Sequence, residues 1–417
     1  ANGKRTNLDT FDPNQQTFPK LLQNAGYRTA LIGKWHLKSD PSGFDYWDIV
    51  PGQGHYYNPD FISAAGTREI EGYNTDIITD LALEWLKERE EPEQPFMLMC
   101  QYKAPHRTWA PGPDHLTTYD DVDIPEPATL FDDYANRSDF LKENEMSIAG
   151  HLMDEYDLKL AGSKEKDVLG RAFKNPEFAR MTAEQRQKWD AAYEPKNAEF
   201  RKNPPTGKDR VRWNYQRYIK DYLRCVASVD DNIGRLLDYL DDSGLADNTL
   251  VIYSSDQGFY LGEHGWYDKR WMYEESLAMP FVARWPGRIP AGTSIDKLTQ
   301  NIDFAPTFLD AAGVATPADM HGASLLPLLR GKKSDWRQSI YYHYYEEGEH
   351  NVPAHEGVRG ERFKLIHFYT RNTWEFYDLE NDPQEMVNQY QNPDYSEQVQ
   401  QLYAELERLK KLYNAPD

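Results

Sequence analysis

Two short polar motifs follow apolar, strand-like runs and could contact a bound anion. Lys34 and His36, separated by one residue, come directly after the run from 27 to 32. Because alternate residues of an extended chain point to the same side, this ammonium and imidazole can face one group together. His106 follows a second run, from 96 to 102. Taken alone, each motif also fits a solvated strand-end lysine or a loop histidine bonded to backbone.

A third apolar run, from 250 to 253, leads into oxygen ligands for a cation. Asp256 and Gln257 follow it, and Gly258 allows the backbone to turn closely around a bound ion. Carboxylate and amide oxygens are the ligands that calcium prefers, but two of them do not complete a site. Lys269 comes a little later, and its ammonium could bind an oxyanion as a point charge. The alternative for Lys269 is a solvated lysine in a turn.

The elements around these motifs predict an α/β fold. Apolar residues at helical spacing indicate helices over 18–24, 75–88 and 218–240. Each of the three apolar strands follows or precedes such a helix and ends in polar residues. This alternation is typical of a sheet whose functional site lies at the carboxyl ends of the strands.

Two further regions have a different pattern. The stretch from about 112 to 214 is polar and interrupted by prolines, and we interpret it as a helical insertion bordering the site. After about 334 the chain changes to short strands, which predict a small antiparallel sheet followed by one amphipathic helix. The expected domains are therefore 1–334 and 335–417. The expected strands of the second domain cover 339–345, 355–359, 363–369 and 374–378.

Composition limits the function classes. The net charge of −21 argues against a nucleic-acid partner, so an anionic substrate would need locally concentrated cations. The 11 Trp, 28 Tyr and 17 Phe can build a core and can also line a carbohydrate site. No apolar run is long enough for a membrane span. Cys100 and Cys225 lie in apolar surroundings and are expected to be buried and unpaired.

A longer motif connects these observations. The sequence from Gly26 to Leu37, which contains Gly-Lys-Trp-His, resembles the second signature of type I sulfatases, the formylglycine enzymes of the alkaline phosphatase superfamily. That resemblance implies a large mixed sheet sandwiched by helices, with a smaller C-terminal antiparallel sheet and helix. The later motifs keep the family's order: Ala104-Pro105-His106, Ser255 to Gly258, Gly262 to Gly265 with Lys269, Tyr273 to Pro280, Val358-Arg359 with Phe363 to Ile366, and Tyr377 to Glu385.

The resemblance assigns catalytic roles to four residues. Lys34 and Lys269 would hold the sulfate oxygens. His36 would bond to the formylglycine hydrate and help to expel sulfate from it, while His106 would contact the sulfate or protonate the leaving sugar oxygen. Such cations and hydrogen-bond donors offset the charge on the transferring group.

Part of the family pattern is absent. The resemblance implies one calcium site that uses Asp256 and Gln257 together with an Asp-Asp pair on the family's first strand. That strand also leads into a Cys/Ser-x-Pro-x-Arg motif, whose Cys or Ser becomes formylglycine. Neither element is present, since Cys100 precedes Gln-Tyr-Lys and Cys225 precedes Val-Ala-Ser. We therefore expect the natural chain to extend N-terminally by on the order of 30 residues or more, and the given residues alone to be inactive.

The substrate expectation rests on a narrower resemblance. The turn at 103–107 and the segment from 342 to 359 look like bacterial sulfatases assigned to N-acetylglucosamine 6-sulfate. His343, His355 and Arg359 could bond to sugar hydroxyls or an N-linked substituent beside aromatic rings. The alternative is that both histidines are ordinary strand residues. The expected reaction is removal of the 6-O-sulfate from a terminal N-acetylglucosamine or glucosamine of a glycosaminoglycan or mucin-type glycan.

Other functions remain open. A phosphodiesterase or phosphomutase of the same superfamily would use Thr or Ser as nucleophile and two metal ions, whereas the set Lys34, His36 and Lys269 favours sulfate. A non-catalytic protein that binds sulfated glycans would keep the anion pocket without the nucleophile. A formylglycine peptide in a mass spectrum would separate these readings. The resemblance implies a periplasmic or extracellular location, and the sequence leaves the oligomeric state open.

Overall fold

The computed structural model describes residues 2–89, 91, 93–332 and 335–415, and it has two compact units. Apart from the undescribed positions, the first unit comprises 1–3, 9–127 and 147–246, and the second comprises 4–8, 128–146 and 247–417. The expected domain boundary at 334 lies outside the described residues. The expected insertion is shared between the units, because 128–146 packs with the second.

A five-stranded sheet of order β4-β3-β2-β1-β5 forms the centre of the first unit. Its middle strand β1 pairs in parallel with β2 and β5, while β3 and β4 are antiparallel, so the sheet is mixed. The predicted strands at 27–32 and 96–102 are confirmed as β1 and β5, and β2, β3 and β4 were not predicted. The bounds are β1 Arg28–Trp35, β2 Tyr46–Pro51, β3 Asp60–Ser63, β4 Gly66–Glu69 and β5 Phe96–Gln101.

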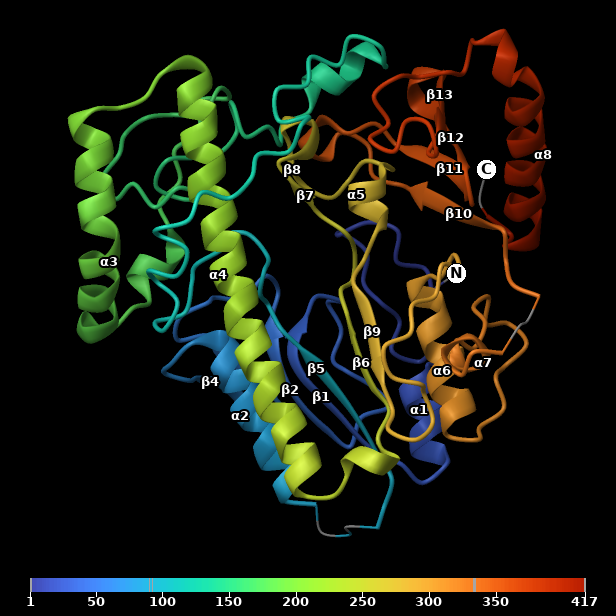
Figure 1. The fold of residues 1–417 in the computed structure, drawn as a ribbon. Coiled ribbons are helices and arrows are strands. Elements are labelled where there is room, and N and C mark those ends of the chain that lie inside the picture. Colours follow the sequence, from blue (N-terminus) through green and yellow to red (C-terminus); the bar gives the residue numbers. More distant parts are fainter. Residues whose placement is uncertain (1, 90, 92, 333–334, 416–417) are drawn as a thin grey trace. The chain divides into compact units, whose positions relative to one another are not determined.

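The predicted helices of this unit are confirmed. Helix α1 spans Phe18–Asn24, α2 spans Asn74–Lys87, and α4 runs from Gly207 to Asp242, longer than expected. Figure 1 shows α2 and α4 side by side along the sheet, and their apolar residues share one core with β1 and β2. The buried members of this core are Ala30, Ile32, Val50, Phe61, Ile77, Ile78, Ala82, Trp85 and Leu86.

The region expected to be a helical insertion is helical only in its last part. Helix α3, Ala183–Lys202, begins with a capping box in which Thr182 and Gln185 bond to each other's backbone N–H groups. From 111 to 182 the chain forms turns and two short 3-10 helices, Asp139–Glu143 and Pro176–Ala179. The prolines and polar residues of this stretch lack the apolar periodicity that stabilises a helix by packing. Buried ion pairs, described below, hold part of it in place.

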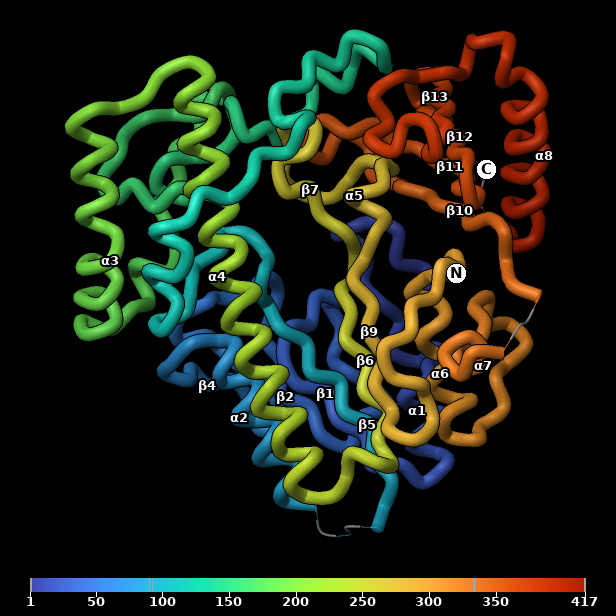
Figure 2. The backbone as a smooth tube through the Cα atoms, in the orientation of Figure 1, coloured from blue at the N-terminus to red at the C-terminus, as the bar shows by residue number. Residues whose placement is uncertain are grey.

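The second unit begins with a two-stranded ribbon. Strand β6, Val251–Ser254, pairs antiparallel with β9, Phe281–Arg284. Figure 2 follows the backbone from β6 through β7 and the one-turn helix α5 into β9. The remaining elements of this part are β7 Tyr260–Leu261, β8 Tyr267–Asp268, α5 Glu274–Leu277, α6 Phe304–Ala311 and α7 Leu326–Leu329.

The C-terminal part of the second unit matches the predicted small sheet. Four antiparallel strands follow the order β10-β11-β12-β13, and helix α8, Ser396–Leu412, packs on one face. That core contains the buried residues Val358, Leu365, Phe376, Leu406 and Leu409. The strands are β10 Ser339–Tyr344, β11 His355–Gly360, β12 Phe363–Phe368 and β13 Thr373–Asp378. Short 3-10 turns occupy Ala246–Asn248, Glu263–Gly265, Asn301–Asp303, Glu349–Asn351, Tyr369–Arg371 and Pro393–Tyr395.

The two cysteines were expected to be buried and unpaired; Cys225 is buried, and Cys100 is half-buried. Cys100 and Cys225 are both free, and burial raises the pKa of each thiol to about 12, which disfavours a reactive thiolate. Across the described part of the chain, no helix is long and apolar enough to cross a membrane.

Candidate active site

Lys34 and His36 lie at the carboxyl end of β1, as expected. Lys34 is the penultimate residue of the strand, and its Nζ donates to Gln53 Oε1 at 3.0 Å. Gly33 before it has φ +113°, and a Cβ there would lie 2.0 Å from the carbonyl oxygen of Gln101 on β5. Only glycine allows the two strands to approach in this way just ahead of the lysine. The half-buried His36 follows one residue beyond the strand.

His106 sits in a tight turn after β5 and has a fixed ring orientation. Its Nδ1 lies 2.8 Å from the carbonyl oxygen of Arg107, so Nδ1 carries a proton and donates it. Its own carbonyl accepts the hydroxyl of Tyr56 at 2.6 Å. Lys103, 3 % exposed, places its ammonium 4.6 Å from the centre of the same tyrosine ring. Nε2 of His106 is therefore the ring atom that could exchange a proton with a ligand.

Charged residues of the insertion hold this turn. Arg107 makes two bonds to the carboxylate of Asp157, at 2.7 and 2.6 Å. The ammonium of Lys159, fully buried, donates to the carbonyl of Thr108 at 2.7 Å and pairs with Asp221 at 3.3 Å. Burial lowers the pKa of Lys159, which the two neighbouring aspartates oppose. The insertion thus fixes the backbone that presents His106.

In the second unit, Asp256 and Gln257 form the loop after β6. Asp256 is exposed, and its Oδ1 accepts from Ser255 Oγ at 3.3 Å. Gly258 packs so closely on α5 that a Cβ would lie 2.1 Å from the carbonyl oxygen of Glu275. The two oxygen donors fit calcium in kind but not in number. Within the described residues there is no group of three or more His, Cys, Asp or Glu side chains that could hold a metal ion.

Lys269 returns to this loop through the short hairpin of β7 and β8. Tyr260 pairs with Asp268, and the ammonium of Lys269 lies 5.7 Å from the centre of the Phe259 ring. Asp268 is 3.7 Å from that ammonium and also accepts from Arg270 Nη1 at 2.8 Å. Asp268 and Arg270 were not predicted to belong to the site. The run Asp268-Lys269-Arg270 after two aromatic residues was the available signal.

A buried cluster supports the hairpin. His264, fully buried, lies with Nδ1 3.2 Å from Asp132 and 3.1 Å from Arg137, which itself pairs with that aspartate. Its Nε2 is 3.6 Å from a carboxylate oxygen of Glu275 on α5. His264 has φ 54°, so the turn is held in a conformation that non-glycine residues rarely adopt. This cluster joins the hairpin to the start of α5.

The two candidate sugar histidines lie on opposite faces of the C-terminal sheet. His343 pairs with Glu356 and Tyr344 pairs with His355, so the histidines belong to alternate positions of the ladder. His343 faces α8, and its ring nitrogens bind the hydroxyls of Tyr341 and Tyr369 at 2.8 and 3.1 Å. Burial lowers its pKa to about 4. The structure therefore does not bring His343 and His355 together.

His355 lies on the face toward the Lys269 hairpin. It is fully buried, its Nδ1 donates to the carbonyl of Pro353 at 2.8 Å, and its Nε2 has no hydrogen-bond partner among the described residues. Its ring stacks near Trp271, with centroids 6.3 Å apart. Burial lowers its pKa to about 4, so the ring is neutral at neutral pH.

Arg359, on the same face as His355, is engaged with α5. Its Nη2 donates to Glu274 at 2.9 Å, and the fully buried Lys364 pairs with the same carboxylate at 2.8 Å and with Glu385 at 2.7 Å. Burial opposes ionisation of Glu274, but Lys364 and Arg359 bring its pKa to about 2. Burial raises the pKa of Glu385 to about 7. Glu274 is therefore a structural partner of Arg359.

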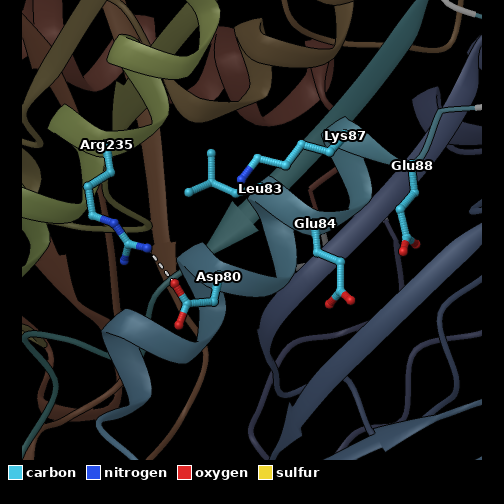
Figure 3. A pocket seen from close by; sticks show the side chains of 6 residues that line it. All are labelled: Asp80, Leu83, Glu84, Lys87, Glu88 and Arg235. Atoms are coloured by element: carbon cyan, nitrogen blue, oxygen red, sulfur yellow. Dashed lines mark hydrogen bonds and ion pairs between the residues drawn. The ribbon is translucent and has the colours of Figure 1, made fainter.

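A hollow of about 440 Å³ in the first unit lies at the end of the sheet opposite to Lys34 and His106. It is lined by residues of α2 and by Arg235 of α4, which pairs with Asp80 (Figure 3). Helix α2 ends at Lys87, shortly before β5 begins, so the hollow lies at the amino ends of the parallel strands. Ligands of α/β sheets bind at the carboxyl ends, where Lys34 and His106 are found.

Two protein-family models match most of the chain. The family model described as Sulfatase matches residues 4–314, and the model described as N-sulphoglucosamine sulphohydrolase, C-terminal, matches 262–412. An N-acetylglucosamine-6-O-sulfatase of Bacteroides thetaiotaomicron is 49% identical over 428 residues, covering 100% of this chain and 76% of that protein. The human N-acetylglucosamine-6-sulfatase is 29% identical and covers 81% of this chain and 53% of its own length.

Solved structures agree in fold. A protein determined in complex with its substrate D-glucosamine-2-N,6-O-disulfate superposes with a TM-score of 0.95 at 48% identity, covering 100% of this chain and 86% of that one. A putative sulfatase of Bacteroides fragilis superposes with a TM-score of 0.69 at 19% identity, covering 98% and 79%, and shows the fold alone. The predicted α/β sulfatase-like architecture and the predicted family are confirmed. The chain belongs to the sulfatase family and is a sulfuric ester hydrolase.

Proposed function

We propose that this protein removes the 6-O-sulfate from N-acetylglucosamine or glucosamine residues at the non-reducing end of glycosaminoglycan or mucin-type glycans. The observation that carries the proposal is the 49% identity, over the full chain, to an N-acetylglucosamine-6-O-sulfatase. The match at 48% identity to a protein bound to a glucosamine 2-N,6-O-disulfate supports the same sugar and sulfate position.

In this reaction the cations act on the sulfate. Lys34 and Lys269 bind its oxygens, and His36 bonds to the hydrated nucleophile and helps to release sulfate from it. His106 donates a proton from Nε2 to the leaving sugar oxygen, since its Nδ1 is held by the Arg107 carbonyl. These groups stabilise charge that develops in the transition state.

Asp256 and Gln257 contribute to a calcium site. When bound, calcium polarises one sulfate oxygen. The donor chemistry of the loop supports this role, and the remaining ligands have to come from other parts of the protein. Asp256→Ala should reduce kcat by about 10²–10³-fold, the size of effect seen when one electrostatic stabiliser is removed, with little change in unfolding temperature. Full activity of that variant, or of enzyme treated with a chelator, would contradict the assignment.

The nucleophile is proposed to be a formylglycine. The 417 residues contain no Cys/Ser-x-Pro-x-Arg motif, and both cysteines have raised pKa values. Mass spectrometry of a tryptic digest of the full-length protein tests this directly. A formylglycine peptide supports the proposal, and a complete peptide map without one contradicts it.

Substrate recognition is proposed to use the side of the C-terminal sheet that faces the Lys269 hairpin. His355 and Arg359 are on that side, and Asp268 and Arg270 flank Lys269. His343, the third residue we expected to bind sugar, lies on the α8 face with both ring nitrogens bonded to tyrosines. The proposed location is periplasmic or extracellular, in keeping with relatives in Caenorhabditis elegans and Drosophila melanogaster that are named as extracellular sulfatases.

A panel of sulfated monosaccharides tests the substrate. We expect the full-length enzyme to release sulfate from glucosamine 6-sulfate and N-acetylglucosamine 6-sulfate at least about 100-fold faster, in kcat/KM, than from galactose 6-sulfate or a 2-O-sulfated uronic acid. Polar groups that pair with specific hydroxyls reject sugars lacking them by such factors or more. A preference for either of the latter sugars would overturn the assignment and leave the sulfatase family membership intact.

A further inference from the structure

One serine on α5 is bonded to both functional segments of the second unit. The carbonyl oxygen of Ser276 accepts the N–H of Gly258 at 3.0 Å, and its Oγ donates to the carbonyl of Lys269 at 2.9 Å. Gly258 directly follows Asp256 and Gln257, the candidate calcium ligands. Ser276 is 5 % exposed, so neither bond competes with bulk water. The two segments are therefore joined through a single residue.

The backbone of Gly258 lies directly against the backbone of α5. A Cβ on Gly258 would lie 2.1 Å from the carbonyl oxygen of Glu275 and 2.8 Å from that of Ser276. The loop backbone thus rests on the backbone of α5, with no flexible side chain between them. The position of the loop therefore depends on the position of α5.

Two further contacts hold the segment around Lys269 against the residues that follow the Asp256–Gln257 loop. The pairing of Tyr260 with Asp268 brings the end of the hairpin back toward β6, and the Lys269 ammonium lies over the ring of Phe259. The hydroxyl of Ser276 ties the backbone of Lys269 to α5.

Helix α5 has four residues and could not keep its position through its own hydrogen bonds. It is fixed from the C-terminal sheet instead. The N–H of Glu274 donates to Glu385 Oε2 at 2.7 Å, and the Glu274 carboxylate pairs with Arg359 and Lys364. Ser276 is therefore carried on an anchored element.

We propose that Ser276 is a positioning residue of the sulfatase reaction, which fixes the backbone of Lys269 relative to the Asp256–Gln257 loop. The inference rests on the proposed roles of those three residues in binding one sulfate and its calcium ion. Displacing a group by about 1 Å from the productive geometry can reduce the rate by about 100-fold. Loss of the hydroxyl should therefore lower kcat while substrate binding through the rest of the site persists.

The kinetic test uses three variants of Ser276 in the full-length enzyme, two of which, threonine and valine, have the same shape. Ser276→Thr keeps the hydroxyl, Ser276→Val lacks it, and Ser276→Ala removes it without adding a methyl group. We expect kcat on N-acetylglucosamine 6-sulfate to fall by about tenfold or more in the valine and alanine variants, with KM changed less than about threefold, and to recover in the threonine variant. Ser228→Ala is the matched control, because Ser228 is 3 % exposed and donates to the Arg224 carbonyl within α4.

A second readout is independent of turnover. Calcium is titrated by calorimetry into metal-free enzyme, with and without saturating inorganic sulfate. In the wild type we expect sulfate to raise the calcium affinity at least about threefold, since both would bind one site, and Ser276→Val to lose most of that coupling while Ser276→Thr keeps it. If the valine and alanine variants keep the wild-type kcat and coupling, the inference on Ser276 is overturned alone. If wild-type enzyme desulfates without binding calcium, the proposed calcium role fails and the inference fails with it.

Discussion

The two faces of the C-terminal sheet differ in what their polar residues bind. On the face covered by α8, polar groups bind one another: Glu356 accepts from Lys410 at 2.7 Å and from Tyr341 at 2.9 Å, and His343 bonds to two tyrosine hydroxyls.

On the opposite face, polar groups bind the segment that leads to the candidate site. Lys364, fully buried, pairs with Glu274 of α5 and with Glu385, while Arg359 pairs with Glu274. The ring of His355 stacks near Trp271, two residues after Lys269. Charge on this face therefore positions α5, whereas the Glu356–Lys410 pair of the α8 face joins the sheet to its helix.

The largest expected effect is on the face toward the hairpin. Lys364→Met leaves Glu385 buried without a cation, so we expect the free energy of unfolding to drop by about 3–5 kcal/mol. The matched change on the α8 face, Lys410→Met, removes a cation from a more solvated pair and should cost about 1 kcal/mol. Urea denaturation at pH 7 measures both. Equal losses in the two variants would remove the distinction between the faces.

Glu385 should make stability fall as pH rises. Burial raises its pKa from 4.5 to about 7, so its contribution is present below the unfolded pKa and is lost as pH increases through 7. A shift of this size corresponds to about 3 kcal/mol at most between pH 4 and pH 8. Glu385→Gln should remove this component of the pH profile, measured by denaturation across that range. A profile that is unchanged in the variant would show that Glu385 does not titrate there.

Glu356 on the α8 face should give the opposite sign. Burial opposes its ionisation, but bonds from His367, Lys410 and Tyr341 lower its pKa from 4.5 to about 2. Its contribution is therefore present above pH 4.5 and is lost as pH falls toward 2, by about 1–2 kcal/mol after allowance for solvent screening. Comparing Glu356→Gln with wild type at pH 7 and pH 3 tests this, since the difference in unfolding free energy should shrink at the lower pH.

The smallest effect concerns the two histidines and their influence on turnover. We expect His343→Phe to keep kcat/KM within about twofold, because His343 faces α8 and is away from the hairpin. His355→Phe alters the ring packed near Trp271, and we expect its loss of kcat/KM to be several-fold larger than that of His343→Phe. The reverse order, with His343→Phe the more impaired on N-acetylglucosamine 6-sulfate, would mean that the α8 face contributes to the site.

Much of the fold followed from sequence patterns. The strands β1, β5 and β6, the helices α1, α2 and α4, and the whole C-terminal sheet were predicted, because their apolar periodicity matches the way they are buried. Strand β2 was missed because Asp48 interrupts its apolar run, and the structure shows that this buried carboxylate pairs with Arg68 of β4. The two-residue strands β7 and β8 are too short to leave a periodic signal.

Less of the site could be predicted. Lys34 lies at the end of β1 and Asp256 lies just after β6, as expected. These positions could be predicted because a residue close to the end of a strand is placed by that strand. The faces of His343 and His355 could not be predicted, since the alternation within β10 does not carry across the irregular connection to β11. Ser276 lies within the Tyr273 to Pro280 motif, but its proposed role could not be predicted, because that role depends on two bonds to distant backbone groups.

The most direct test of the account is sulfate release from N-acetylglucosamine 6-sulfate by the full-length enzyme and its Lys269→Ala variant, measured in one assay with the free sugar quantified. We expect clear release by the wild type and a loss of kcat/KM of about 10²–10³-fold in the variant, whose circular dichroism spectrum should be unchanged. No release by the wild type, or equal release by both proteins, would contradict it.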